Sequence, residues 1–264
     1  MADKPIIQVK DLTAGYGDTI VLKDIDFEVR VGEIFAILGG SGSGKTTLLK
    51  CLIGLQKPLT GVILIDGTDM VTAEGEERLT LLTKIGVAYQ SGALFGSMTV
   101  LTNVSLPLQE FTDLPPAAIE KMAQMKLKAV GLQEAAYKMP AELSGGMRKR
   151  AAIARALAMD PKILFLDEPS AGLDPVTSAQ LDELILGLSH DLGITFVVVT
   201  HELPSIFTVA DRVIMVDREA RTIIAAGKPQ ELRDKSDNPV VRRFFHRQLG
   251  PGGVAGPTGR PVLT

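Results

Sequence analysis

The feature that most constrains this chain is a glycine-rich loop between an apolar run and a helical pattern. Residues 39–46 read GGSGSGKT and fit the phosphate-loop pattern GxxxxGK[ST]. The loop follows the apolar run Ile34 to Leu38 and precedes the helical pattern Lys45 to Leu55. Small residues let successive backbone N–H groups surround phosphate oxygens, and the helix start adds positive potential. The order strand, loop, helix therefore predicts a nucleotide phosphate site and disfavours an ordinary glycine-rich turn.

The positions of this loop have distinct expected roles. Lys45 is placed to bridge the terminal phosphates of a nucleotide, and Thr46 can ligate Mg²⁺. The remaining cofactor-binding candidates of the loop are Gly39, Gly40, Ser41, Gly42, Ser43, Gly44 and Thr47.

Strand and helix patterns alternate along most of the chain. Apolar and polar residues alternate at Ile6 to Thr13 and Thr19 to Val29, which predicts an antiparallel β layer. A strand pair is expected at Gly61–Asp66 and Ile85–Tyr89, around a helix near Glu76–Leu82, and further strands at Ile163–Leu166, Thr195–Val199 and Arg212–Val216. Strands separated by helices predict an α/β fold with a mainly parallel sheet.

Two stretches depart from this alternation. From Ser91 to Ser144 the strand patterns vanish and apolar residues fall near helical spacing, which predicts a helical insert. Residues 250–264 contain five Gly and three Pro and predict a flexible tail. We therefore expect one domain over residues 1–249, with a helical subdomain at about 91–144.

Two carboxylates follow a buried-type strand. The run Ile163 to Leu166 leads into Asp167 and Glu168, at the strand end where open α/β sheets place their ligands. Asp167 is suited to hold Mg²⁺, and Glu168 can polarise the water that attacks a γ-phosphate. Read alone, the two acids could also just end a strand or cap the next helix.

A second helix start is a further possible phosphate cradle. Ser144 is an N-cap residue type, and Gly145 and Gly146 permit close approach of an anion to the backbone. The helix then carries Arg148, Lys149, Arg150 and Arg155, which we expect to form a solvated face.

Taken together, these motifs resemble the nucleotide-binding subunit of ATP-binding cassette (ABC) transporters. In chain order, GGSGSGKT resembles the family's phosphate loop, Gln90 its Q-loop, LSGGM its signature, ILFLDE its Walker B strand, SAGLD its D-loop and His201 its switch histidine. The resemblance implies the P-loop NTPase fold of ABC ATPases, ATP and Mg²⁺ as cofactors, and ATP hydrolysis.

The resemblance also implies roles for single residues. ATP would lie between two subunits, held by the phosphate loop of one and by Ser144, Gly145 and Gly146 of the other, so a homodimer is expected. Tyr16 resembles the adenine-stacking residue, and Gln90 would reach Mg²⁺ or the attacking water. His201 ends a predicted strand and would contact the γ-phosphate or position water, and Asp174 would lie at the dimer interface.

One position departs from the common family form. Met147 stands where the signature usually has Gln. The serine and the glycines that face phosphate are kept, so only contacts of the Gln side chain are affected.

A narrower resemblance concerns the cargo. The runs QSGALFGSMTVLTNVSLPL and ELSGGMRKRAAIARALA are similar to ATPases of the Mla family, which work with MCE-domain proteins in bacterial phospholipid trafficking. This resemblance implies separate membrane permeases that dock near Ser91 to Val104, an MCE-domain lipid-binding protein and sometimes a STAS-domain partner. The alternative is an ATPase subunit of an importer or exporter for another solute.

Composition and charge restrict the remaining classes of function. With 28 Lys+Arg and 31 Asp+Glu the net charge is −3, which disfavours a nucleic-acid-binding module. Cys51 is the single cysteine, which excludes an internal disulfide and favours a reducing compartment. No stretch reaches about 20 apolar residues, and no signal-peptide pattern is seen, so we expect neither a membrane span nor secretion. The resemblance to transporter subunits implies a peripheral protein on the cytoplasmic face of the inner membrane. The segment Val240 to Leu249 mixes aromatic and basic residues and is a candidate contact with a partner subunit or permease.

Overall fold

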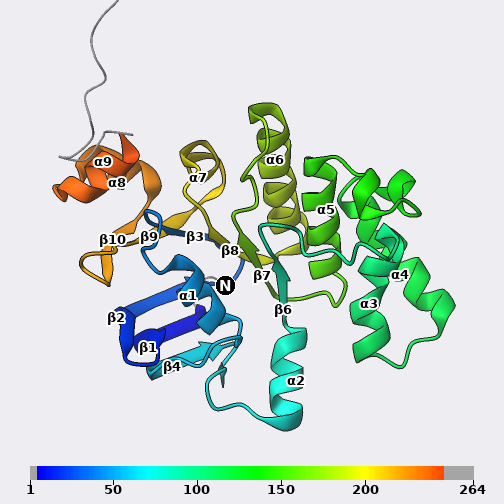
Figure 1. The fold of residues 1–264 in the computed structure, drawn as a ribbon, viewed down its shortest axis with the longest axis horizontal. Helices are drawn as coiled ribbons and strands as arrows, with labels where there is room; N and C mark the ends of the chain where they lie inside the picture. Colours follow the sequence, from blue (N-terminus) through cyan, green and yellow to red (C-terminus); the bar gives the residue numbers. More distant parts are fainter. Residues whose placement is uncertain (1–4, 247–264) are drawn as a thin grey trace, which may run out of the picture.

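The computed structural model describes residues 5–246 as two β-sheets with helices around them (Figure 1). One sheet is antiparallel, with four strands in the order β2-β1-β4-β5. The other has six strands in the order β10-β9-β3-β8-β7-β6. In it β9, β3, β8, β7 and β6 run parallel, and only β10 is antiparallel to its neighbour. The predicted α/β fold with a mainly parallel sheet and an antiparallel layer is confirmed.

The strands are β1 (Pro5–Tyr16), β2 (Thr19–Arg30), β3 (Ile34–Leu38), β4 (Thr60–Ile65), β5 (Thr68–Asp69), β6 (Ile85–Ala88), β7 (Ile163–Asp167), β8 (Thr195–Val199), β9 (Arg212–Val216) and β10 (Ile223–Gly227). The helices are α1 (Lys45–Leu52), α2 (Gly75–Thr83), α3 (Val100–Phe111), α4 (Pro116–Ala129), α5 (Gly145–Ala156), α6 (Pro175–Leu192), α7 (Leu203–Val209), α8 (Pro229–Lys235) and α9 (Pro239–Phe245), with short 3-10 turns η1 (Gln133–Ala135) and η2 (Pro140–Glu142).

The parallel sheet separates two hydrophobic cores because successive side chains of a strand point to opposite faces. On β7, Phe165 packs with α1 and the antiparallel layer. Its neighbours Leu164 and Leu166 pack with α5, α6 and the helical segment that contains α3 and α4. All three side chains are fully buried. This two-sided burial is why β7 is a continuous apolar run and not an alternating one.

Two local predictions differ from the structure. The expected pair at 61–66 and 85–89 does not exist, because β4 pairs with β1 in the antiparallel layer while β6 pairs with β7 at the edge of the parallel sheet. The first helix ends at Leu52 and not at Leu55, because Gly54 takes a left-handed φ of 72° just after it.

The end of the described chain folds back onto the sheet. In α9, Val241 and Phe245 are buried against residues of α7 and β9, and the Phe207 and Phe245 rings lie 5.7 Å apart. These two side chains are therefore covered by this chain. The predicted contact of the segment Val240 to Leu249 with a partner stays a prediction, and its residues 247–249 lie outside the described residues. The predicted flexible tail 250–264 lies outside the described residues.

Two side chains of the fold, Asp66 and Cys51, have shifted pKa values. Asp66 accepts hydrogen bonds from Lys162 at 2.8 Å and Lys84 at 2.9 Å, and these bonds hold the pKa of its carboxyl below the ordinary value. Cys51, on α1, is 1% exposed, and burial raises the pKa of its thiol to about 11.

Candidate nucleotide site

The phosphate loop connects β3 to α1, as its motif requires. The ammonium of Lys45 lies inside the loop, where it donates hydrogen bonds to the carbonyl oxygens of Gly39 at 2.8 Å and Gly40 at 3.0 Å. Burial lowers the pKa of this ammonium, while the charges of Glu168 and Asp167 raise it. Lys45 is therefore held inside the loop, near the two acids at the end of β7.

The glycines of the loop leave room for an anion. A Cβ on Gly39 would lie 2.4 Å from the carbonyl oxygen of Val216, whereas a Cβ on Gly40 would meet nothing within 4 Å. The hydroxyl of Ser43 is buried without a hydrogen-bond partner among the described residues. Buried polar atoms normally have partners, so an open cradle beside an unpartnered hydroxyl fits a loop that binds a phosphate. Ser41, Gly42 and Gly44 complete its backbone.

The acidic residues and the histidine meet at one edge of the parallel sheet. Since β7 and β8 are neighbours, Glu168 after β7 and His201 after β8 come together, with Oε1 of Glu168 2.8 Å from Nδ1 of His201. Glu168 is buried, takes a left-handed φ of 47°, and its Oε2 has no partner among the described residues. Such strain and an unpartnered acceptor are typical of functional sites.

Asp167 and Thr46 supply the oxygens suited to a metal ion. Asp167 ends β7, and Thr46 lies in the first turn of α1. Burial raises the pKa of the Asp167 carboxyl, as does the charge of Glu168, while Lys149 and Lys45 act in the opposite direction. Gln90 follows β6, the neighbour of β7, so its backbone reaches the same edge of the sheet.

Two cations of α5 do not form the solvated face that the sequence suggested. Lys149 donates to the carbonyl oxygens of Gln90 and Glu168, and Arg155 donates to the carbonyl oxygens of Gly92 and Ala93. Sequence reasoning missed both residues, because periodicity cannot show which carbonyls a helix face will meet.

The signature residues begin α5, which packs on the opposite face of the parallel sheet from α1, the helix that follows the phosphate loop. Ser144 caps the helix and accepts a hydrogen bond from the amide of Met147 at 3.3 Å. A Cβ on Gly146 would lie 2.4 Å from Cγ2 of Thr177 in α6, while Gly145 has more room. Within residues 5–246 no hydrogen bond joins Ser144, Gly145 or Gly146 to the phosphate loop. One chain thus carries two separate halves of the expected site.

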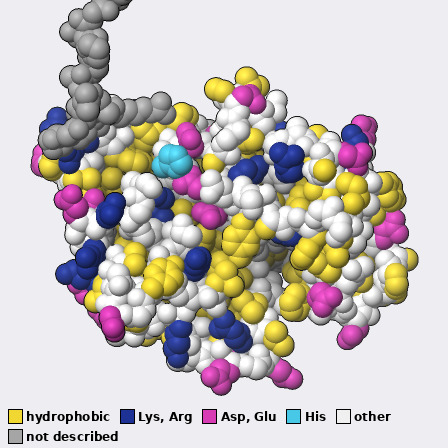
Figure 2. Space-filling view, viewed as in Figure 1, with side chains coloured by type: hydrophobic (Ala, Val, Ile, Leu, Met, Phe, Trp, Pro, Cys, Tyr) yellow, Lys and Arg dark blue, Asp and Glu magenta, His cyan; other side chains and the backbone are white. Residues whose placement is uncertain are grey.

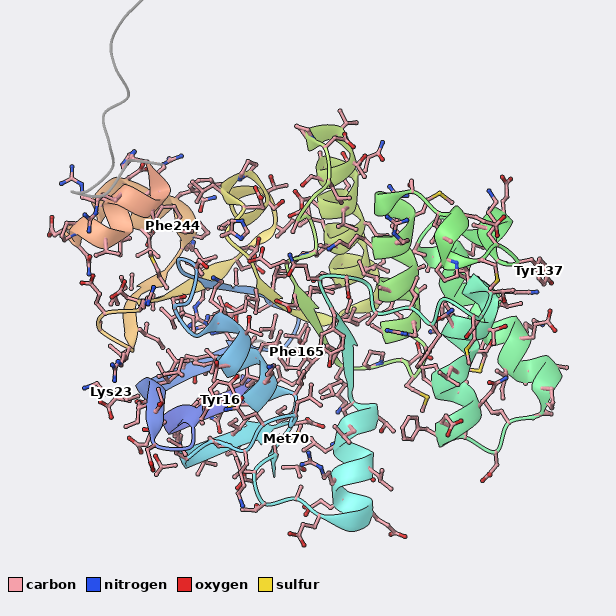
Figure 3. The ribbon with its side chains drawn as sticks, in the orientation of Figure 1. Tyr16, Lys23, Met70, Tyr137, Phe165 and Phe244 are labelled. Atoms are coloured by element: carbon pink, nitrogen blue, oxygen red, sulfur yellow. The ribbon has the colours of Figure 1, made fainter. Side chains whose placement is uncertain are left out.

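Asp174 and Tyr16 also have defined local positions. Asp174 caps α6, accepting hydrogen bonds from the amides of Val176 at 3.1 Å and Thr177 at 3.0 Å. Tyr16 ends β1, is 53% exposed, and lies on the side of the molecule that carries α1 (Figure 3). Its hydroxyl is 3.5 Å from Oγ1 of Thr47. Gln56, which sequence reasoning missed, donates to the carbonyl of the adjacent Gly15 at 2.7 Å.

Comparison with known proteins agrees with this geometry. The family model described as ABC transporter matches residues 22–171. The probable ribonucleotide transport ATP-binding protein mkl of Mycobacterium leprae (strain TN) is 42% identical over 250 residues, covering 94% of this chain and 71% of that protein. The intermembrane phospholipid transport system ATP-binding protein MlaF of Escherichia coli (strain K12) is 41% identical over 241 residues, covering 91% and 88%.

A solved structure gives the same fold. The dimeric ATP-binding cassette MJ0796, in a post-hydrolysis state with ADP and Pi, matches with a TM-score of 0.76 and 32% identity, covering 84% of this chain and 98% of that one. Together with the motif order and the geometry of the loop, these matches show that the chain belongs to the ABC transporter family of ATP-binding subunits and is an ATP hydrolase.

Proposed function

We propose that this chain is the ATP-hydrolysing subunit of a bacterial phospholipid transporter and works as a homodimer bound to separate permease subunits. The observation that supports a phospholipid cargo is the 41% identity with MlaF, of which this chain covers 88%. The mkl relative is named for ribonucleotide transport, so transport of another solute is the second candidate function. We favour phospholipid because this chain covers only 71% of mkl.

In the proposed dimer, ATP binds between the phosphate loop of one copy and Ser144, Gly145 and Gly146 of the other. The separation of these two half-sites within one chain supports this arrangement, as does the dimeric form of MJ0796. Tyr16 stacks on the adenine, since its ring is exposed on the α1 side. Asp174 lies close to the interface and keeps the start of α6 in place through its capping bonds.

The end of β7 and the phosphate loop supply the groups suited to Mg²⁺ and to the attacking water. Thr46, Asp167 and Gln90 would hold Mg²⁺, which would neutralise developing phosphate charge. Glu168 acts as the general base toward the attacking water, and its buried Oε2, which has no partner within residues 5–246, is the atom available for that proton. His201 fixes the other oxygen of Glu168 through its 2.8 Å contact and faces the γ-phosphate.

The permease docks at the groove between the sheet edge and the helical segment. A cavity of about 170 Å³ there is lined mainly by apolar residues of α2, β6, α3 and α5, including Leu82, Ile85 and Phe111. Phe111, which lines the cavity, and Phe95, which belongs to the predicted segment 91–104, are each about half exposed, and hydrophobic side chains gather over this region in Figure 2. The cavity lies next to the predicted segment 91–104, although no residue of that segment lines it.

The location and the remaining partners follow from the same proposal. Among residues 5–246, none of the helices combines the length and apolar character needed to cross a bilayer. We place the chain on the cytoplasmic face of the inner membrane, bound through the permease. An MCE-domain protein and a STAS-domain protein complete the assembly, and nucleic acid has no part in it.

The first experiment tests the catalytic assignment. Glu168→Gln keeps the shape of the side chain but removes the base, so turnover should fall by about 10²- to 10⁴-fold while ATP affinity is kept and ATP traps a dimer. Glu183→Gln, at an exposed position of α6, is the matched control and should behave as wild type. Wild-type turnover of Glu168→Gln would remove Glu168 from the role of base.

The second experiment tests the cargo. The tagged chain is purified from its native membranes in mild detergent, and co-purified proteins and lipids are identified by mass spectrometry. Enriched phospholipid with a permease and an MCE-domain protein supports the proposal. A permease accompanied by a solute-binding protein would keep the ATPase assignment and overturn the lipid cargo.

A further inference from the structure

Lys149 joins three parts of the nucleotide site through one ammonium group. It lies in the first half of α5, the helix that begins with Gly145 and Gly146 of the signature. Its Nζ donates one hydrogen bond to the carbonyl oxygen of Gln90 at 2.5 Å and another to that of Glu168 at 2.9 Å. The signature helix, the Q-loop and the end of β7 thus meet at a single side chain.

The contact of Lys149 with Glu168 differs in origin from the other hydrogen bonds of Glu168. The amide of Glu168 donates to the carbonyl of Val199 at 2.8 Å, and its carboxylate contacts His201. These two partners belong to β8 or the residues just after it. The carbonyl oxygen of Glu168 accepts a hydrogen bond from the amide of Ala171 at 3.2 Å as well as from Lys149. Within residues 5–246, Lys149 is the donor that reaches this carbonyl from a helix, and Glu168 has a strained φ of 47°. The direction of the Glu168 side chain depends on that strained backbone.

Arg155 provides an internal comparison. It lies farther along the same helix and donates to the carbonyl oxygens of Ala93 at 2.8 Å and Gly92 at 3.2 Å. It therefore ties the segment after Gln90 to α5, as Lys149 does, but no hydrogen bond from it to Glu168 is found within residues 5–246. Substitution of Arg155 therefore removes hydrogen bonds between α5 and the segment after Gln90 and leaves the contact with Glu168 in place.

The charge of Lys149 suits a position beside two carboxylates. Burial lowers the pKa of its ammonium, and the nearby charges of Asp167 and Glu168 raise it. A cation with several donors can hold two carbonyl oxygens and offset acidic charge at the same time, whereas a neutral side chain can do at most part of this.

We propose that Lys149 is a positioning residue that couples the signature helix and the Q-loop to the orientation of Glu168. A shift of α5 relative to β7 moves the Glu168 carbonyl through Lys149 and, with it, the carboxylate that faces the attacking water. The proposal rests on the role of Glu168 given above. Lys149 acts through the backbone of Glu168 and touches no reacting atom.

The test compares four variants in steady-state ATPase assays that separate kcat from KM. Lys149→Met removes both hydrogen bonds, and Lys149→Arg keeps a cation with several donors. Arg155→Gln is the tether control, and Lys149→Met is repeated in the Glu168→Gln background. ATP affinity and the unfolding midpoint are measured for each variant, and Lys149→Gln replaces Lys149→Met if the latter does not fold.

Displacing a catalytic group by about 1 Å can cost up to about 10²-fold in rate. We expect Lys149→Met to lower kcat by about 10- to 100-fold with ATP affinity unchanged, Lys149→Arg to restore most of the loss, and Arg155→Gln to leave kcat much less affected. In the Glu168→Gln background Lys149→Met should cost nothing further.

Three results would overturn the coupling: an unchanged kcat for Lys149→Met, equal losses for Lys149→Met and Arg155→Gln, or an undiminished loss in the Glu168→Gln background. These results differ from failure of the Glu168 assignment itself, which would appear as wild-type turnover of the Glu168→Gln single variant.

Discussion

Replacing Lys45 with alanine tests how the phosphate loop holds a nucleotide. An ammonium has three donors, and two of them already serve the carbonyl oxygens of Gly39 and Gly40. One donor is therefore free for a terminal phosphate without breaking the loop. A hydrogen bond to a charged group contributes about 1.5–3 kcal/mol. At about 1.4 kcal/mol for each factor of ten, Lys45→Ala should weaken ATP binding roughly 10- to 150-fold.

The assay is an equilibrium titration with a fluorescent ATP analogue, together with urea unfolding of the nucleotide-free chain. Lys45→Ala should also lose some stability, because two carbonyls of the loop lose their donor. Lys128→Ala, at an exposed position of α4, is the control and should change neither quantity. An unchanged ATP affinity for Lys45→Ala would refute the reasoning, because it would mean that the third donor does not reach the phosphate.

Three further predictions concern the stability of the fold. Gly86→Ala should lower the free energy of unfolding by about 1–3 kcal/mol, because the new Cβ would lie 2.2 Å from the carbonyl oxygen of Ala156. The control Gly96→Ala places its Cβ in open space and should be neutral in urea unfolding. Asp66→Asn should cost about 1 kcal/mol at neutral pH. The pKa of Asp66 is lowered in the folded chain, so its stabilisation is present above the ordinary Asp pKa and is lost as pH falls through the lowered value. The unfolding free energies of variant and wild type should therefore converge in acid. A constant difference between them across a pH series would contradict this. Phe245→Ala should cost about 3–5 kcal/mol in thermal or urea unfolding, because the ring is buried between α9 and the sheet. A neutral effect would contradict the docking of α9.

Motifs with fixed local geometry could be placed from the sequence. The phosphate loop required a strand before it and a helix after it, and β3 and α1 stand there. Strand ends were also informative, because parallel neighbours bring their carboxyl ends to one edge; Glu168 and His201 meet there for that reason. Local patterns therefore predicted the fold class and the acidic edge of the candidate site.

Contacts between distant segments could not be placed in the same way. The sequence of α5 shows that Lys149 and Arg155 are cations, but only the packing of α5 beside β6 and β7 decides that they meet backbone carbonyls and not solvent. Sheet membership was equally hidden, since β4 and β6 have similar apolar patterns and belong to different sheets. Such facts depend on tertiary pairing, which a local pattern does not contain.

The burial of Cys51 makes this chain convenient for site-directed labelling. Cys51 is the chain's single cysteine, and with 1% exposure and a thiol pKa of about 11 it presents almost no thiolate to a reagent at neutral pH. A cysteine introduced at Val176, which is 67% exposed at the start of α6, would therefore take a spin label or fluorophore selectively in the otherwise native sequence. In the proposed homodimer, distances between two such labels would report how the two copies move during a cycle of ATP binding and release, without any need to remove the native thiol first.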